Sequence, residues 1–92
     1  MTEKAIETYL RDSVKKAGGK AYKFVSPGND GMPDRIAVFP GGRIVFVELK
    51  APGKKPTPLQ LLQHNRLREL GTRVCVVDSK AGVDGLMKEF GA

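Results

Sequence analysis

The 92-residue sequence contains one cysteine and no apolar run long enough to cross a membrane. The single cysteine, Cys75, excludes an intrachain disulfide, and its place in the apolar run 74–77 predicts a small core residue in a reducing compartment. A membrane-spanning helix needs roughly 20 consecutive apolar residues, and no signal-peptide pattern opens the sequence. We therefore expect a cytoplasmic protein that binds no membrane.

The sequence also lacks internal repeats, low-complexity tracts and an interdomain linker. A chain of this length supports one modest hydrophobic core and leaves no room for a second domain. We therefore predict one domain over residues 1–92.

Acidic residues are in the minority, with 10 Asp and Glu against 16 Lys and Arg, which gives a formal net charge of +6. Basic side chains that neutralise phosphates release condensed counterions, so this charge favours a polyanionic partner. Many small proteins without a nucleic-acid role are also basic, and the charge alone does not decide between the two.

The pattern of apolar residues and turn formers predicts an α/β fold. Helices are predicted over 3–17, 58–70 and 81–90, and strands over 20–25, 34–39, 43–50 and 72–77. The turn formers in 26–33 predict a loop, and Pro40-Gly41-Gly42 predicts a hairpin. The strand–helix–strand connection after residue 43 favours a parallel pairing, and hence a mixed sheet flanked by helices. In the second helix, four leucines recur on one face: Leu59, Leu62, Leu67 and Leu70.

Charged residues end the most apolar strand, which reads IVFVEL from Ile44 to Leu49 and is apolar enough to be buried on both faces. Glu48 and Lys50 are two residues apart, so both side chains leave the same face. A buried carboxylate costs several kcal/mol unless it is paired or binds a metal. One interpretation is therefore an ion pair between Glu48 and Lys50 at the strand end. The other adds Asp34 from the neighbouring strand, so that two carboxylates bind Mg²⁺ beside a fixed positive charge.

The metal interpretation places a condition on the hairpin. A tight two-residue turn at Gly41-Gly42 would pair Asp34 with Leu49 and put the carboxylates of Asp34 and Glu48 on opposite faces of the sheet. The site therefore requires an odd-length loop, a bulge, or a position of Asp34 just outside the regular strand.

Pro33-Asp34 followed by Glu48-Leu49-Lys50 resembles the signature of the PD-(D/E)xK nucleases, whose core has the order αβββαβ. The flanking residues are more specific and resemble the VRR-NUC branch, the virus-type replication-repair nucleases, in its stand-alone phage and bacterial form. These residues are Gly31-Met32-Pro33-Asp34-Arg35, Gly42, Phe46-Val47-Glu48-Leu49-Lys50, Pro52-Gly53, Pro56 and Leu59-Gln60. The resemblance covers residues 7–78 and departs from the family pattern at no motif position.

The resemblance implies a role for individual residues. Asp34, Glu48 and the main-chain carbonyl of Leu49 would bind Mg²⁺ or Mn²⁺. Lys50 would activate the attacking water and stabilise charge on the scissile phosphate. The glutamate of the family's first helix falls on Glu7, and the glutamine after its basic loop falls on Gln60.

Structural roles compete for several of these positions. Thr57-Pro58-Leu59-Gln60 is a capping box with proline at the first helical position, so Gln60 has a role at the helix start, with or without one in the site. Glu7 borders the buried stripe of the first helix, but Glu3 lies near the same edge, and spacing does not choose between them. His64, one turn beyond Gln60, could face the site, but a lone histidine on a helix is usually a surface residue, and we expect it to be one.

Basic residues that flank the proposed metal site are the candidates for contact with phosphates. Arg35, Lys54 and Lys55 meet this condition. Lys15 and Lys16 lie on the polar face of the first helix, where we expect solvated charges instead.

The resemblance implies a metal-dependent DNA endonuclease that leaves 5′-phosphate and 3′-hydroxyl ends and prefers branched DNA, above all Holliday junctions, in a bacterial or phage-infected cell. Two alternatives are a non-catalytic DNA-binding module on a nuclease fold and a sequence-specific restriction-type nuclease. Two symmetric nicks in a junction favour a homodimer. The apolar residues available for its interface are Met32, Leu61, Val83, Leu86, Met87 and Phe90, unless the last four cover their own sheet.

Overall fold

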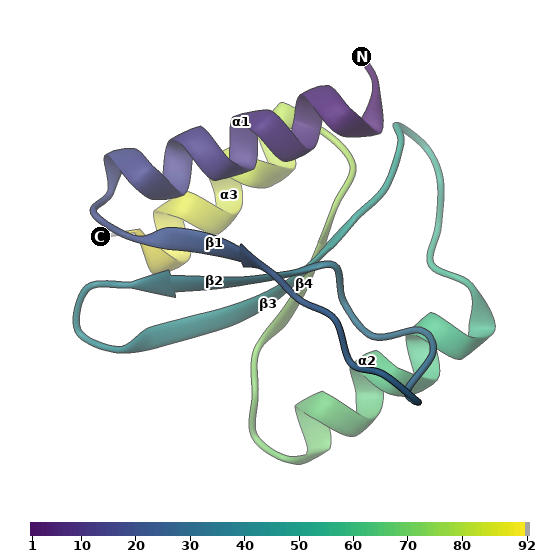
Figure 1. Cartoon of the computed structure of the whole chain (residues 1–92). Helices are drawn as coiled ribbons and strands as arrows, with labels where there is room; N and C mark the ends of the chain where they lie inside the picture. Colours follow the sequence, from purple (N-terminus) through teal and green to yellow (C-terminus); the bar gives the residue numbers. More distant parts are fainter. Residues whose placement is uncertain (92) are drawn as a thin grey trace.

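The computed structural model describes residues 1–91 and contains a four-stranded sheet with helices on both faces (Figure 1). The elements are α1 (Glu3–Lys16), β1 (Lys20–Lys23), β2 (Arg35–Phe39), β3 (Arg43–Leu49), α2 (Pro58–Glu69), β4 (Val74–Val77) and α3 (Lys80–Phe90). The strands lie in the order β1-β2-β3-β4. β2 is antiparallel to both β1 and β3, and β4 is parallel to β3. The predicted αβββαβ order and the mixed sheet are confirmed, and α3 follows them.

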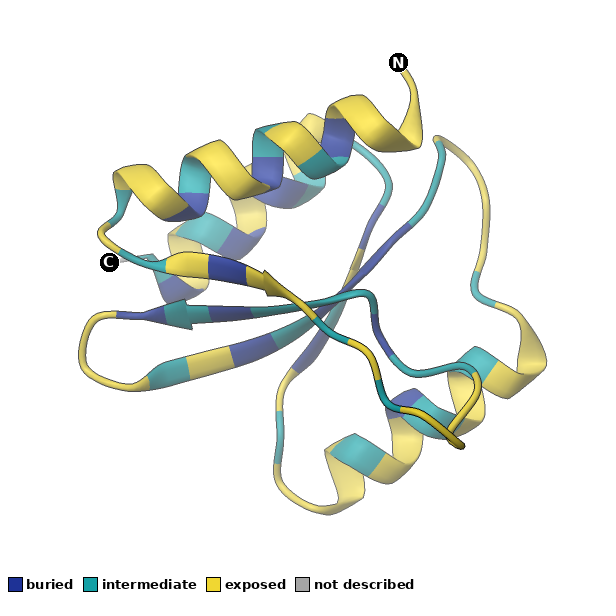
Figure 2. Cartoon of the chain, viewed as in Figure 1, coloured by how far each residue is buried: buried dark blue, intermediate teal, exposed yellow. Residues whose placement is uncertain are grey.

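The hydrophobic core lies between one face of the sheet and the helices α1 and α3, which run side by side (Figure 2). Ile6, Leu10 and Val14 of α1 are fully buried, because their spacing of four places them on one side of the helix. Burial of each such side chain stabilises the fold by about 1.5–3 kcal/mol. The Thr2 hydroxyl caps the helix by accepting a hydrogen bond from the Ala5 N–H at 3.1 Å.

The helix α3 covers its own sheet. Val83, Leu86 and Phe90 are buried, and the Phe90 ring stacks on Phe39 with a centroid distance of 6.4 Å. Met87 is partly buried against the same cluster. These four residues are therefore core residues, and the sequence-based suggestion that they form an interface between chains is wrong.

The hairpin between β2 and β3 turns through three residues, since Phe39 pairs with Arg43. Gly41 and Gly42 both have positive φ angles, 88° and 78°, which other residues rarely adopt. The register continues as Ala37 with Val45 and Arg35 with Val47. The loop is thus odd in length, as the metal site requires.

The opposite face of the sheet is only partly covered. The helix α2 lies over one end of this face, and most of its surface is exposed (Figures 1 and 2). The predicted leucine face of α2 is not a core face: Leu59 and Leu62 are about half exposed, Leu67 is half-buried, and Leu70 is 82% exposed. The prediction that β3 is buried on both faces holds only near its end, because Ile44 is half exposed.

All four strands are shorter than predicted, β2 and β3 by one residue and β1 and β4 by two. β1 ends at Lys23, although the Phe24 N–H still donates to the Asp34 carbonyl at 2.9 Å, and β4 begins at Val74 and not at residue 72. Cys75 of β4 is a free, partly buried thiol that packs against the core. Within residues 1–91, no helix has both the length and the apolar character needed to cross a membrane.

Candidate active site

Asp34 and Glu48 come together at the end of the sheet away from the hairpin turn. Arg35 pairs with Val47, so Asp34, which lies just outside β2, stands opposite Glu48 and on the same face. Asp34 Oδ2 accepts a hydrogen bond from the Leu49 N–H at 2.9 Å, which holds its carboxylate against β3. The condition that the sequence placed on the hairpin is met, and the two carboxylates are neighbours.

The Glu48 carboxylate is buried, with 1% of the residue exposed, on the sheet face that α2 covers. Its Oε2 accepts a hydrogen bond from Gln60 Nε2 at 3.2 Å and lies 3.7 Å from Lys50 Nζ. Its Oε1 lies 3.5 Å from His64 Nε2 but has no hydrogen-bond partner among the described residues. A buried carboxylate oxygen without a partner is costly, and such atoms are concentrated at functional sites.

The pKa of Glu48 is raised from 4.5 to about 7, mainly by burial and also by the negative charge of Asp34, whereas Lys50 opposes the shift. The carboxyl group is therefore harder to ionise in the folded protein than in the unfolded chain. A strongly shifted pKa with an identifiable charged partner is typical of catalytic and metal-binding groups.

Glu48→Gln is expected to stabilise the metal-free protein at pH 8 by about 1–3 kcal/mol and to have little effect at pH 4.5. A folded-state pKa raised above the unfolded value means that Glu48 favours folding while it is protonated. That contribution is lost as the pH rises from 4.5 through about 7. Urea unfolding in EDTA at both pH values measures the difference between the variant and wild type, and an equal difference at the two would contradict the shifted pKa.

Lys50 follows β3 directly and continues its alternation, so its side chain lies on the same face as Glu48. The side chain is only 15% exposed, and its ammonium is held beside the buried carboxylate. The ion pair proposed as the alternative to a metal site is thus present. It does not exclude the metal site, because Oε1 of Glu48 stays outside it.

Gln60 forms the capping box and also contacts Glu48, so the two roles that the sequence left open are compatible; its role in the site stays a prediction. Its Oε1 accepts from the Thr57 N–H at 2.9 Å, and its own N–H donates to the Thr57 hydroxyl at 3.2 Å, which completes the capping box. The same amide group donates through Nε2 to Glu48. The start of α2 is therefore fixed to the carboxylate by one side chain.

His64 lies beside Glu48, where the sequence did not place it. It is fully buried and is the one buried residue of α2, so the prediction of a surface residue is wrong. Burial lowers its pKa, and the positive charges of Arg68 and Lys50 lower it further, which favours the neutral imidazole. Its position four residues after Gln60 places both side chains on one side of the helix, and this spacing had already allowed a position that faces the site.

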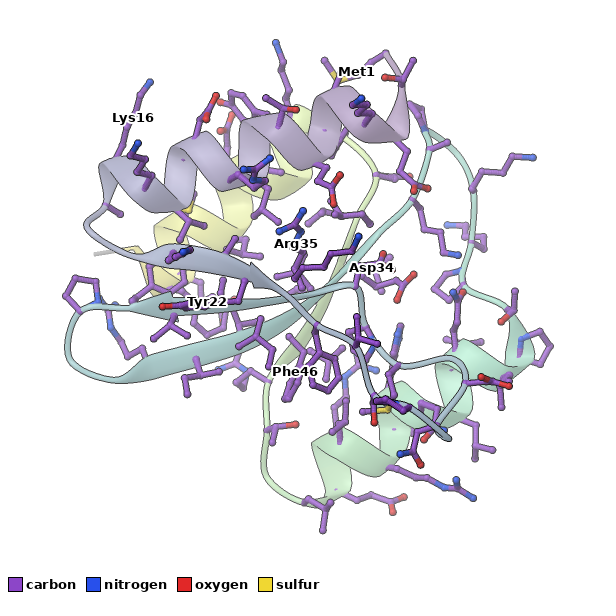
Figure 3. The ribbon with its side chains drawn as sticks, viewed as in Figure 1. Met1, Lys16, Tyr22, Asp34, Arg35 and Phe46 are labelled. Atoms are coloured by element: carbon purple, nitrogen blue, oxygen red, sulfur yellow. The ribbon has the colours of Figure 1, made fainter. Side chains whose placement is uncertain are left out.

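Glu7 lies on the other side of the sheet from this cluster and pairs with Arg35. Arg35 Nε and Nη2 donate to Glu7 Oε2 at 3.1 and 3.0 Å, and Nη1 donates to the Ala21 carbonyl at 3.2 Å. Figure 3 shows the Arg35 side chain between α1 and β1, next to Asp34. Glu3 is exposed at the first turn of α1. Glu7 is therefore the better placed of the two glutamates, and its role in the site stays a prediction.

The basic loop between β3 and α2 brings Lys54 and Lys55 to the surface, where both are exposed. The loop is held by the Gly53 N–H, which donates to Asp78 Oδ2 at 3.2 Å, and by the Lys54 N–H, which donates to the Ala51 carbonyl at 3.0 Å. Their contact with phosphates, and that of Arg35, stay predictions.

The donor set fits a hard divalent cation. Asp34 and Glu48 present two neighbouring carboxylates, one with a buried oxygen that lacks a partner among the described residues, and the Leu49 backbone is hydrogen-bonded to Asp34. Oxygen ligands from one or two carboxylates, completed by water and phosphate, suit Mg²⁺. Residues 1–91 contain no group of three or more His, Cys, Asp or Glu side chains arranged for a metal, so a cation held by Asp34 and Glu48 would take its other ligands from the backbone, water and phosphate.

Comparison with known proteins relates the chain to a protein named as a nuclease and to a solved nuclease-family domain. No family model matches the chain. A protein named "Putative nuclease p44", from Acyrthosiphon pisum secondary endosymbiont phage 1, is 58% identical over 78 residues, which cover 85% of this chain and 84% of that protein. A solved structure described as "VRR_NUC domain" superposes with a TM-score of 0.88 at 36% identity and covers 96% of this chain and 97% of that one.

The resemblance carried by the residues around Asp34 and Glu48 is thus matched by likeness over almost the entire fold. At this identity and coverage, in sequence and in structure, the chain belongs to the VRR-NUC family.

Proposed function

We propose that the protein is a divalent-metal-dependent DNA endonuclease that hydrolyses phosphodiester bonds. The observation that carries this proposal is the buried, metal-compatible pair Asp34 and Glu48 with Lys50 beside it, in a member of the VRR-NUC family. A relative that covers most of the chain is itself named as a nuclease. The basic charge of the chain suits a polyanionic substrate.

The protein's own groups have distinct parts in this reaction. Asp34, Glu48 and the Leu49 carbonyl would bind Mg²⁺ or Mn²⁺, which supplies the Lewis acidity that polarises a phosphate oxygen and acidifies water. Lys50 places a fixed positive charge where negative charge gathers on the phosphate in the transition state. Gln60 holds the Glu48 carboxylate through a hydrogen bond, and His64 packs against its other oxygen.

The proposed substrate is branched DNA, above all a four-way junction cut to 5′-phosphate and 3′-hydroxyl ends. Each chain carries one set of Asp34, Glu48 and Lys50, so two symmetric nicks call for two chains. A twofold dimer delivers them together. The homodimer is supported by leucine side chains on α2 and directly after it that are exposed to water: Leu59, Leu61, Leu62 and Leu70.

The proposal is tested with labelled four-way junction, duplex and single-stranded DNA in Mg²⁺, Mn²⁺ or EDTA. We expect cleavage of the junction in Mg²⁺ or Mn²⁺, slower cleavage of the duplex, and none in EDTA. Cleavage in EDTA would contradict the metal site. DNA binding without cleavage in either metal would favour the non-catalytic module, and fragments with one fixed sequence would favour a restriction-type nuclease.

The same preparation tests the assembly. Light scattering should give the mass of two chains, and Leu61→Lys/Leu62→Lys should give the mass of one. A single-chain mass for the wild-type protein that still nicks both strands of a junction symmetrically would contradict the dimer.

A further inference from the structure

A groove of about 610 Å³ lies between α1 and the edge strand β1. Its walls carry five basic side chains and one acidic one: Arg11, Lys15, Lys20, Lys23, Arg35 and Asp12. Gly19, at the closed end of the groove, packs against β2, because a Cβ atom there would lie 2.3 Å from the Val38 carbonyl oxygen.

Most of the positive charge in this groove is not neutralised by the protein. Arg35 pairs with Glu7, but no ion pair within residues 1–91 involves Arg11, Lys15, Lys20 or Lys23. Like charges that converge on one groove repel one another, and a polyanion that enters it replaces repulsion with attraction and releases its counterions.

The groove begins beside the candidate active site. Lys23 of β1 pairs with Arg35 of β2, and the Phe24 N–H bonds to the carbonyl of Asp34. Arg35 thus lines the groove, follows the proposed metal ligand in the chain, and holds Glu7 (Figure 3). A DNA backbone that lies in the groove would therefore reach the end of the sheet at which Asp34 and Glu48 lie.

We propose that this groove binds the sugar–phosphate backbone of the DNA on one side of the cleaved bond. The inference rests on the proposed nuclease function and adds a path for the DNA to it. Lysine ammonium groups contact phosphates as point charges and do not read bases, so the contact is independent of sequence. Tyr22, half exposed at the rim, adds an aromatic ring of the kind on which unpaired bases stack. Lys15, which the sequence assigned to a solvated helix face, is then a DNA contact.

The structure supplies a matched control for the test. Lys15 and Lys16 are neighbours on α1 and both are exposed, but only Lys15 lines the groove, and Lys16 projects away from the sheet (Figure 3). Lys23 lines the groove, whereas Lys88 of α3 is exposed outside it. Lys15→Gln/Lys23→Gln and Lys16→Gln/Lys88→Gln therefore remove equal charge from two different places.

Binding of a fluorescein-labelled DNA duplex is measured by anisotropy in EDTA at a series of salt concentrations. For the groove variant, the slope of log K against log salt should fall by about two, one for each lost phosphate contact. The control variant should keep the wild-type slope. Equal slopes for the two variants would overturn the proposal. It would also be overturned if the groove variant bound DNA as the wild-type protein does but no longer bound phosphatidylserine vesicles.

The proposal and the nuclease function fail in different ways. If the slope of log K against log salt falls in the groove variant but the wild-type protein cleaves no DNA in Mg²⁺ or Mn²⁺, the groove proposal is supported and the nuclease proposal is contradicted. If the wild-type protein cleaves DNA and both variants keep the wild-type slope, the groove proposal is contradicted and the nuclease proposal is supported.

Discussion

Replacement of Glu48 or Asp34 by alanine is expected to abolish DNA cleavage while DNA binding stays within a few-fold of wild type. Each carboxylate is a proposed ligand of the metal, and loss of either leaves the cation without one of its few protein oxygens. The basic groove and the basic loop, which are proposed to carry the affinity, are untouched. Single-turnover cleavage of a labelled junction in Mg²⁺ measures the first effect, and anisotropy in EDTA measures the second.

Two further variants separate chemistry from folding. Glu48→Gln keeps the size of the side chain and should be as inactive as Glu48→Ala, even though it is expected to stabilise the metal-free protein above pH 7. Glu69→Ala removes an exposed carboxylate at the end of α2 and should cleave as wild type does. A folded Glu48→Gln protein with wild-type cleavage would show that the metal ligands are misassigned.

Lys50→Ala is expected to lower the rate of cleavage by roughly 10²-fold or more, the scale on which one preorganised electrostatic group contributes to catalysis. Its ammonium is held at 3.7 Å from Glu48 in a nearly buried position, so its charge is screened less than that of an exposed lysine. The effect should lie in the rate at saturating enzyme, because Lys50 acts on the transition state and not on ground-state binding.

Lys55→Ala is the matched control for Lys50→Ala. Lys55 is exposed in the basic loop, and its loss should change affinity and the salt dependence of binding far more than the rate at saturation. A similar rate loss in both variants would mean that Lys50 acts only through the general positive field of this region.

The features predicted correctly from sequence are those set by local pattern. The alternation in β3 placed Glu48 and Lys50 on one face, and the capping box at Thr57 placed Gln60 at the first turn of α2. Both follow from the geometry of a single element. For this reason the location of the candidate metal site could be predicted from the sequence.

The features missed depend on how elements meet. The leucines of α2 form a face on a helical wheel, but α2 docks through Gln60 and His64, so that face meets water. Burial of His64 follows from that docking and cannot be read from spacing alone. The pair between Arg35 and Glu7 joins residues 28 positions apart, and no local pattern predicts it.

The three-residue turn Pro40-Gly41-Gly42 restricts how the gene for such a protein can change. Surface turns commonly accept insertions and deletions of any length. Here, loss or gain of one residue would shift the pairing of β2 with β3 by one position if the turn kept its three residues, and would move Asp34 to the sheet face opposite Glu48. The turn lies at the end of the β2–β3 hairpin away from Asp34 and Glu48. Length variation in related chains that keep the three-residue turn should therefore come in steps of two residues, or be accompanied by a compensating bulge.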